Sequence, residues 1–140
     1  MVEQTQNVNL KSVAWNEQAA ILLQGAAGVD PTYTLDDLRR EVIEGHATLY
    51  LVSLGADALG YVVLWVDDFG RTRELVIQAG EAFRNHKSAA RLTLPALENF
   101  ARSRGCASMR THVAGGSRFI GSLRDAGFRK TEVVFKKGVV

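Results

Sequence analysis

The sequence has a single cysteine, Cys106, and no long apolar segment. One cysteine excludes an internal disulfide, and without a CxxC partner or other metal-ligand spacing a small buried side chain is its expected role. The longest apolar runs, LYLVSL and YVVLWV, suit strands and are far too short to cross a bilayer. The first residues also lack the charged and apolar regions of a secretory signal. We therefore expect a globular protein of the cytoplasm that has no membrane contact.

Several functional signatures are missing as well. The sequence contains no GxSxG or HExxH motif, and no cluster of histidine and acidic residues at the spacing of a metal site. It has no helix-turn-helix or RNA-recognition signature, and its basic residues are not interleaved with aromatic ones. These absences argue against a metal site, a serine hydrolase and a nucleic-acid partner.

Each half of the chain is poor in charge of one sign. Residues 1–70 hold three basic and ten acidic residues, a net −7, whereas residues 71–140 hold fourteen basic and five acidic ones, a net +9. The net charge of +2 therefore hides a strong asymmetry. Either the basic half attracts an anionic ligand or partner, or the two halves neutralise each other across a shared interface.

The patterns that are present alternate between helix and strand. Residues 34–45 show the clearest helix, with Thr34 as the N-cap, two acidic residues in the first turn and Gly45 at the end. Three successive strand patterns with short turns, over 47–55, 58–68 and 71–80, indicate an antiparallel sheet. Further helices are expected over 15–27, after the third strand and over 117–127, and further strands over 108–113 and 128–137.

This order predicts an α/β (α+β) protein with a mixed, mostly antiparallel central sheet flanked by about four helices. The length of 140 residues suits one domain. We place that domain at residues 14–140, preceded by an N-terminal arm or edge strand at residues 1–13. No internal repeat, low-complexity segment or linker interrupts it.

Over residues 14–138 the element order resembles the GNAT superfamily of acyl-CoA-dependent N-acyltransferases. The resemblance rests on the middle strand LGYVVL, the long helix after the third strand, the ending LRDAGFRKTEVVFKK and, within it, Ala126-Gly127-Phe128. Within the superfamily the chain is similar to the short GNAT-like proteins of tailed bacteriophages, through TLDDLRREVIEGHATLYLV, LPALENFARSRGC and GGSRFIGSLRDAGF. The resemblance implies a GNAT-like fold with a place for acyl-CoA after the third strand.

The stretch FRNHKSAA, residues 83–90, lies where that family grips the pyrophosphate of acyl-CoA. The family uses the pattern Arg/Gln-x-x-Gly-x-Gly/Ala before a helix, because backbone N–H groups and the helix dipole bind the anion there. Arg84 and Ala89 match this pattern, but Lys87 stands in place of the first glycine. If acyl-CoA binds, the resemblance implies that Arg84, Lys87, Ser88 and Ala89 hold it.

Pro95 leaves two starts open for the helix that follows. A start at Ser88 places Pro95 in the helix interior, where it removes a backbone hydrogen bond and crowds the carbonyl of Arg91, at a cost of about 3 kcal/mol. A start near Thr93 places Pro95 in the first turn, with Thr93 as the cap. We prefer the later start, which moves the helix N-terminus away from the pyrophosphate position.

Catalytic members of the family carry the pattern Asn-x-x-Ala-x-x-x-Tyr-x-x-x-Gly-Phe, whose tyrosine protonates the leaving thiolate. The asparagine, alanine and tyrosine positions are here Gly116, Phe119 and Leu123, and leucine has no proton to donate. Two residues remain as candidates for a catalytic base: Glu74 on the third strand and His112 on the strand over 108–113. A salt bridge on the face of the strand explains Glu74 equally well.

Two functions are therefore open. The substituted glycine and tyrosine positions favour a non-catalytic bacteriophage protein. It would be a virion component or assembly accessory that works through contacts with other protein subunits and needs no cofactor. Such a protein is expected in the host cytoplasm and in the virion. The alternative is an acetyl-CoA-dependent N-acetyltransferase that acts on a protein or a small amine. Fold resemblance alone does not decide between them.

Overall fold

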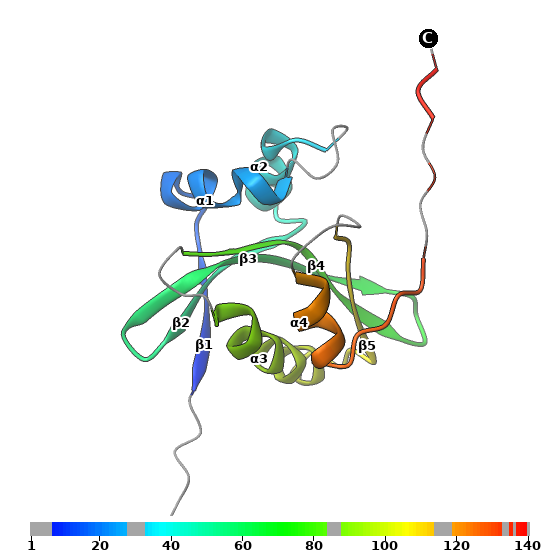
Figure 1. Ribbon diagram of the computed structural model, residues 1–140. Coiled ribbons are helices and arrows are strands. Elements are labelled where there is room, and N and C mark those ends of the chain that lie inside the picture. Colours follow the sequence, from blue (N-terminus) through cyan, green and yellow to red (C-terminus); the bar gives the residue numbers. More distant parts are fainter. Residues whose placement is uncertain are drawn as a thin grey trace, which may run out of the picture.

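The structure is a computed structural model that describes residues 7–27, 33–83, 88–113, 119–132, 135 and 137–139. Its centre is a five-stranded sheet in the order β1-β2-β3-β4-β5 (Figure 1). The strands are β1 (Val8–Val13), β2 (Thr48–Leu54), β3 (Asp57–Asp68), β4 (Arg73–Ala82) and β5 (Ser108–Thr111). The helices are α1 (Glu17–Ala27), α2 (Leu35–Ile43), α3 (Ala89–Ser103) and α4 (Phe119–Asp125).

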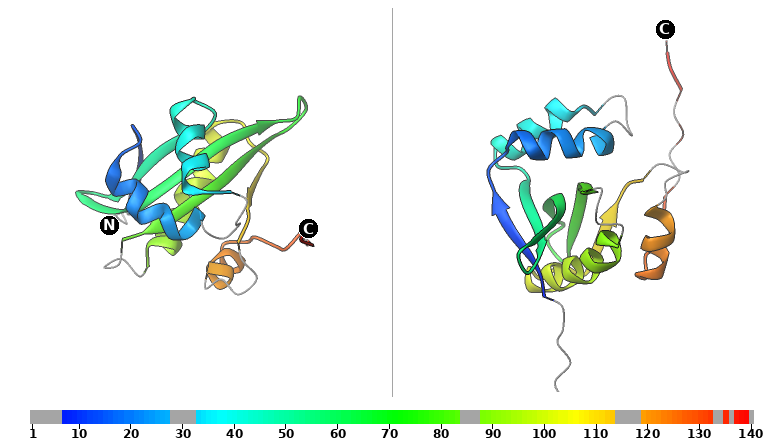
Figure 2. Two further views of the ribbon diagram at one scale, coloured as in Figure 1. Left: turned by 90° about the horizontal axis from the view of Figure 1, so that it is seen from above. Right: turned by 60° about the vertical axis from the view of Figure 1, so that its left-hand side comes forward.

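The sheet is mixed and mostly antiparallel. β1 to β4 are antiparallel neighbours, and β5 joins the edge of β4 in parallel. α1 and α2 lie on one face of the sheet and α3 and α4 on the other (Figure 1; Figure 2). This arrangement confirms the predicted fold class. β1 is an edge strand, so the edge-strand alternative for the N-terminal arm holds for its residues 8–13.

The middle strand, β3, holds the two helix layers together. All of its residues from 59 to 64 are buried. Val62 and Leu64 pack with α3, whereas Tyr61 and Val63 pack with α1 and α2. A strand covered on both faces needs a continuous apolar run, which is why this segment lacks the alternation of a half-exposed strand.

α2 begins as the sequence predicts, at a capping box. Thr34 Oγ1 accepts a hydrogen bond from the Asp37 N–H at 3.2 Å, and Asp37 Oδ2 accepts one from the Thr34 N–H at 2.8 Å. The backbone N–H of Thr34, followed by its hydroxyl, lowers the pKa of the Asp37 carboxyl. The capping box therefore satisfies the N–H groups of Thr34 and Asp37 at the start of this helix.

The expectation of a later start for the long helix is wrong, because α3 begins at Ala89 and contains Pro95. The Leu92 N–H already donates to the Ser88 carbonyl oxygen at 3.2 Å. Ala89 and Leu94 are buried against the sheet, with exposed fractions of 4% and 8%. Burial of this apolar face outweighs the local cost of Pro95, whose own ring is exposed.

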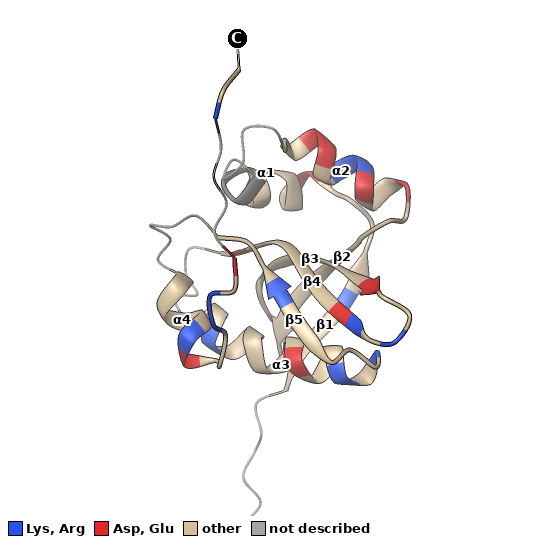
Figure 3. Ribbon diagram, turned by 90° about the vertical axis from the view of Figure 1, so that its right-hand side faces the viewer, with Lys and Arg blue, Asp and Glu red and all other residues tan. Residues whose placement is uncertain are grey.

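The acidic and basic halves of the chain meet in the sheet. Asp68 at the end of β3 pairs with Arg73 at the start of β4, at 3.3 Å. Asp67 pairs with Arg110 of β5 at 3.6 Å. Figure 3 shows acidic and basic residues interspersed along these strands and on α2. Part of the charge asymmetry is thus neutralised where the two halves of the chain pack together.

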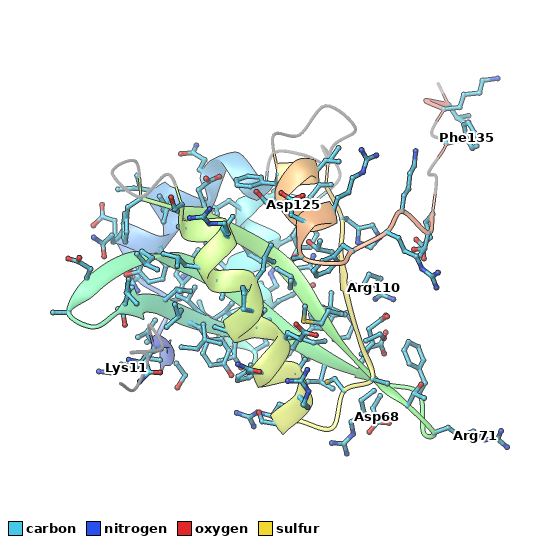
Figure 4. The ribbon with its side chains drawn as sticks, turned by 60° about the horizontal axis from the view of Figure 1, so that its bottom comes forward. Lys11, Asp68, Arg71, Arg110, Asp125 and Phe135 are labelled. Atoms are coloured by element: carbon cyan, nitrogen blue, oxygen red, sulfur yellow. The ribbon has the colours of Figure 1, made fainter. Side chains whose placement is uncertain are left out.

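The strand predicted over 128–137 is not found in the part of it that the structure describes. Residues 128–132 have no regular secondary structure. The Phe128 N–H donates to the Leu123 carbonyl oxygen at 2.9 Å. Phe135 is 92% exposed on a segment that leads away from the sheet (Figure 4). β5 has only four residues, so it offers little edge on which a further strand could pair.

Candidate active site

β4 and β5 separate part-way along their length. Their parallel pairing runs from Glu74–Ser108 to Ile77–Thr111, and β4 then continues to Ala82. The Thr111 hydroxyl donates to the Ile77 carbonyl oxygen at 3.1 Å and holds the last pair together. Beyond this pair the two strands diverge and leave a space between them.

A β-bulge lies at the same level of the sheet. β3 pairs Val63 with Ala79 and Leu64 with Ile77, so Gln78 is the extra residue on β4. A bulge bends its strand and leaves the backbone groups of one residue outside the regular ladder. Sequence analysis did not find this site; its only signal is a glutamine inside the apolar run LVIQAG.

A cavity of about 250 Å³ opens where the strands diverge. The ends of β4 and β5, the first half of α3, and α4 bound it, and most of its lining is apolar. Small-molecule pockets typically have about 300–1,000 Å³, so this cavity suits one part of a large ligand. The polar side chains of its lining include Gln78, Glu81, Thr93, Thr111, His112 and Ser122.

Gly60 of β3 sets the position of one cavity wall. A Cβ at this position would lie 2.2 Å from the Glu81 carbonyl oxygen. β3 and β4 can approach this closely only because residue 60 has no side chain. The glycine pairs with Ala82, so it positions the end of β4 that lines the cavity.

The N-terminus of α3 borders the cavity through Ala89. The side chain of its N-cap residue, Ser88, makes no capping hydrogen bond, and its first turn holds no acidic residue. α2 differs in both respects. Uncapped N–H groups at the positive end of a helix favour an anion. Two of the four predicted cofactor residues, Ser88 and Ala89, therefore lie at this helix end, whereas Arg84 and Lys87 fall outside the described residues.

His112 lies at the rim of the cavity, one residue beyond β5. Its Nε2 is 3.7 Å from Glu132 Oε2, and both side chains are more than half exposed. Glu132 belongs to the segment after α4, which the sequence pattern assigns to a strand and to no site. The structure therefore brings one candidate base to the cavity, beside a carboxylate that the sequence did not indicate.

Glu74, the other candidate base, is not among the residues that line the cavity. Its carboxylate accepts hydrogen bonds from the Arg110 guanidinium at 2.9 Å and from the Ser108 hydroxyl at 2.8 Å. Arg110, labelled in Figure 4, also contacts Asp67 of β3. These contacts tie β3, β4 and β5 together, so Glu74 forms the salt bridge that the sequence left open as its other role.

Leu123 and Phe119 of α4 both line the cavity. These are the positions at which the family pattern places tyrosine and alanine, while the asparagine position, Gly116, lies outside the described residues. The position that the family pattern gives to its tyrosine therefore lies on the cavity wall in this structure.

Tyr33 is tied to α2 by its hydroxyl, which donates to Glu41 Oε2 at 2.8 Å. Burial, and then the Glu41 carboxylate, raises the pKa of Tyr33 well above its usual value. The phenol therefore stays protonated at neutral pH and keeps its hydrogen bond to Glu41 of α2.

No protein-family model matches the sequence, and no curated protein matches it. Solved structures match it in fold. YycN of Bacillus subtilis, described as a candidate acetyltransferase, has a TM-score of 0.70 and 19% identity, over 96% of this chain and 99% of YycN. The aminoglycoside acetyltransferase meta-AAC0020 from an uncultured soil sample, solved with sisomicin, has a TM-score of 0.66 and 11% identity, over 95% and 96%. The aminoglycoside N-acetyltransferase AAC(6')-Iy, solved with CoA, has a TM-score of 0.58 and 15% identity, over 99% of both chains.

The chain therefore has the GNAT-like fold of these acetyltransferases, as the resemblance implied. At such low identities the likeness shows the fold and not the activity. Nothing in the comparisons links the chain to bacteriophages or to a virion. Within the described residues, no helix has the length and apolar character needed to cross a membrane.

Proposed function

We propose that the protein is an acyl-CoA-dependent N-acyltransferase that transfers an acetyl group to an amine. One observation carries the proposal: a cavity between β4 and β5 lies beside the uncapped N-terminus of α3, in a fold shared with acetyltransferases. One of those was solved with CoA. This is the alternative that the sequence left open; the bacteriophage component, with other subunits as partners, stays a prediction.

The residues present fit acyl-CoA in two respects. The apolar space between the strands suits the chain that joins a thioester to its phosphates, and the N-terminus of α3 suits a phosphate. Because α3 begins at Ala89, the objection that its N-terminus is displaced no longer applies. Lys87, in place of a family glycine, remains an objection from the sequence alone. When bound, acyl-CoA supplies an acyl group activated as a thioester.

In this proposal the chain's own residues polarise the acyl group and accept the proton of the amine. The backbone at the Gln78 bulge polarises the acyl carbonyl group, and His112 accepts a proton from the acceptor amine. Leu123 offers no acid, so the departing sulfur takes its proton from solvent. A general acid contributes about 10²–10⁴-fold to a rate. We therefore expect a slow transferase.

Two matched substitutions in α3 test the placement of the phosphate. Arg91 and Arg102 are both exposed, one in the first turn of the helix and one in the last. Arg91→Glu is expected to weaken acetyl-CoA binding roughly five- to tenfold, because it places a negative charge beside the anion. Arg102→Glu makes the same change of charge at the far end and should leave affinity within about twofold. Isothermal titration calorimetry measures both.

The same titration and a thiol-release assay decide the proposal. No heat from the wild type at millimolar acetyl-CoA would overturn acyl-CoA binding, and equal weakening by both substitutions would remove α3 from the site. Release of free thiol with a panel of primary amines would support transfer. Tight binding without release for any amine would make the protein an acyl-CoA-binding module instead of an enzyme.

A further inference from the structure

We infer that Glu132 is a positioning residue for His112: it holds the imidazole by Nε2 and leaves Nδ1 to accept the proton of the acceptor amine. The inference rests on the proposed function and adds the segment after α4 to the active site. It assigns a role to a carboxylate that neither the sequence pattern nor the fold resemblance singled out.

The backbone is held in place one residue before His112 and four residues before Glu132. β5 ends at Thr111, whose hydroxyl is bonded to the Ile77 carbonyl oxygen, so the strand is anchored one residue before His112. α4 is closed by the bond from the Phe128 N–H to the Leu123 carbonyl oxygen. Four residues later Glu132 reaches His112. The contact therefore joins the residue after β5 to the segment after α4, at the rim of the cavity.

The atoms in contact suggest how the pair works. The distance of 3.7 Å between Nε2 and Oε2 is that of an ion pair and is longer than a hydrogen bond. Catalytic contacts of this kind often tighten only when substrate binds. A carboxylate beside Nε2 favours the ring form with its proton on that nitrogen. Nδ1 then carries the available lone pair.

The other charged groups around His112 come from three elements. On β5, the nearest cation is Arg110, which Glu74 and Asp67 already engage. Glu81 of β4 belongs to the same cavity lining. Arg129 and Lys130, both exposed, precede Glu132 in the segment after α4. Glu132 is the acid whose carboxylate lies in contact with the His112 ring, at Nε2.

NMR of the ligand-free protein tests the pairing without any need for activity. The chain has three histidines, so a His112→Gln variant identifies the ring signals. Long-range ¹H–¹⁵N correlations should show the proton of the neutral ring on Nε2, and ¹³C relaxation should show a restricted ring. Glu132→Ala should free the ring and Glu132→Asp should restrict it again. Glu98→Ala, which removes an exposed acid of α3, is the control.

Two NMR outcomes overturn the inference. One is a neutral ring that carries its proton on Nδ1. The other is ring motion that Glu132→Ala leaves unchanged. Neither result depends on whether the protein transfers an acetyl group, so the pairing and the proposed function can fail separately.

Kinetics tests the role of the pair. His112→Gln should lower kcat by about 10²-fold at unchanged KM for acetyl-CoA, as expected for loss of a base. Glu132→Ala should lower kcat about two- to fivefold, since an exposed pair contributes little, and Glu132→Asp should restore most of it. A rise in KM with kcat unchanged would make Glu132 a binding residue and overturn the inference. If no amine is acetylated at all, the proposed function fails, while the NMR result still decides the pairing.

Discussion

In the proposed transferase, Leu123 is the residue that limits the rate, because it has no proton to donate. The family pattern places a proton-donating tyrosine at this position, and the structure places the leucine side chain on the cavity wall. Because the position already faces the ligand space, only the functional group is missing. The chain could therefore regain an acid through one substitution, without a change of backbone.

Leu123→Tyr is expected to raise kcat for acetyl transfer by about tenfold or more, because a phenol supplies the proton that leucine lacks. KM for acetyl-CoA should change little. Steady-state kinetics with the best amine of the panel measures the effect. Leu123→Phe is the matched control, since it adds the ring without the hydroxyl. An equal gain in both variants would assign the effect to packing and contradict the prediction.

Asp37 links stability to pH. Its folded pKa lies below the ordinary 3.8 because Thr34 donates two hydrogen bonds to the carboxylate. The unfolded state thus binds the proton more readily, so the stabilisation is complete above the unfolded pKa and is lost as pH falls through the folded one. We expect Asp37→Asn to lower the free energy of unfolding at pH 7, with a difference from the wild type that shrinks below about pH 4. Urea unfolding at pH 7 and below about pH 4 measures the free energies of unfolding of both proteins. A difference between variant and wild type that stays the same at both pH values would contradict this role of Asp37.

Among the elements, α3 shows most clearly how packing overrides a local signal. Pro95 argues for a start near Thr93, yet the helix begins at Ala89 because its apolar face is buried against the sheet. That start is what brings the N-terminus of α3 to the cavity. The misjudged helix end was one of three arguments against a cofactor site, beside Lys87 at a glycine position and Leu123 at the tyrosine position of the family pattern.

Pro95→Ala should stabilise the protein by about 1–3 kcal/mol, because alanine restores the backbone N–H and removes the clash with the carbonyl of Arg91. The proline ring is exposed, so its loss leaves no buried cavity. Urea denaturation measures the change. Glu98→Ala, exposed on the same helix, should stay within about 0.5 kcal/mol. A loss of stability in Pro95→Ala would mean that α3 needs the bend that proline imposes.

At the scale of the whole molecule, the charge asymmetry is less marked than the sequence suggests. Two ion pairs join the acidic and the basic half of the chain. Asp68 of β3 pairs with Arg73 of β4, and Asp67 of β3 pairs with Arg110 of β5. Acidic and basic positions are interspersed along the helices and strands (Figure 3). Attraction of an anion therefore depends on the cations near α3 and less on a field from the whole basic half.

Salt should accordingly weaken the binding of the phosphate groups of acetyl-CoA and leave the binding of its acyl end unchanged. Raising the salt concentration from 50 to 500 mM is expected to increase KM for acetyl-CoA several-fold, because surface charges are screened within a few ångströms at the higher concentration. KM for the acetyl thioester of N-acetylcysteamine, which has no phosphate, should stay constant. Equal salt effects on both donors would contradict a phosphate site at α3.

The sequence by itself determined the features that depend on neighbouring residues. The capping box of Thr34 and Asp37 and the apolar run of β3 are both local, and the structure contains each of them. The element order was also sufficient to predict the fold class, because helices and strands follow from short-range patterns.

Only the tertiary structure decided the site. The start of α3, the bulge at Gln78, the divergence of β4 from β5 and the contact of His112 with Glu132 all join segments that are distant in sequence. The same holds for residues 128–132, whose strand pattern finds only the four-residue edge of β5 on which to pair. Burial and strand pairing set these features, and both depend on the partners that the fold supplies.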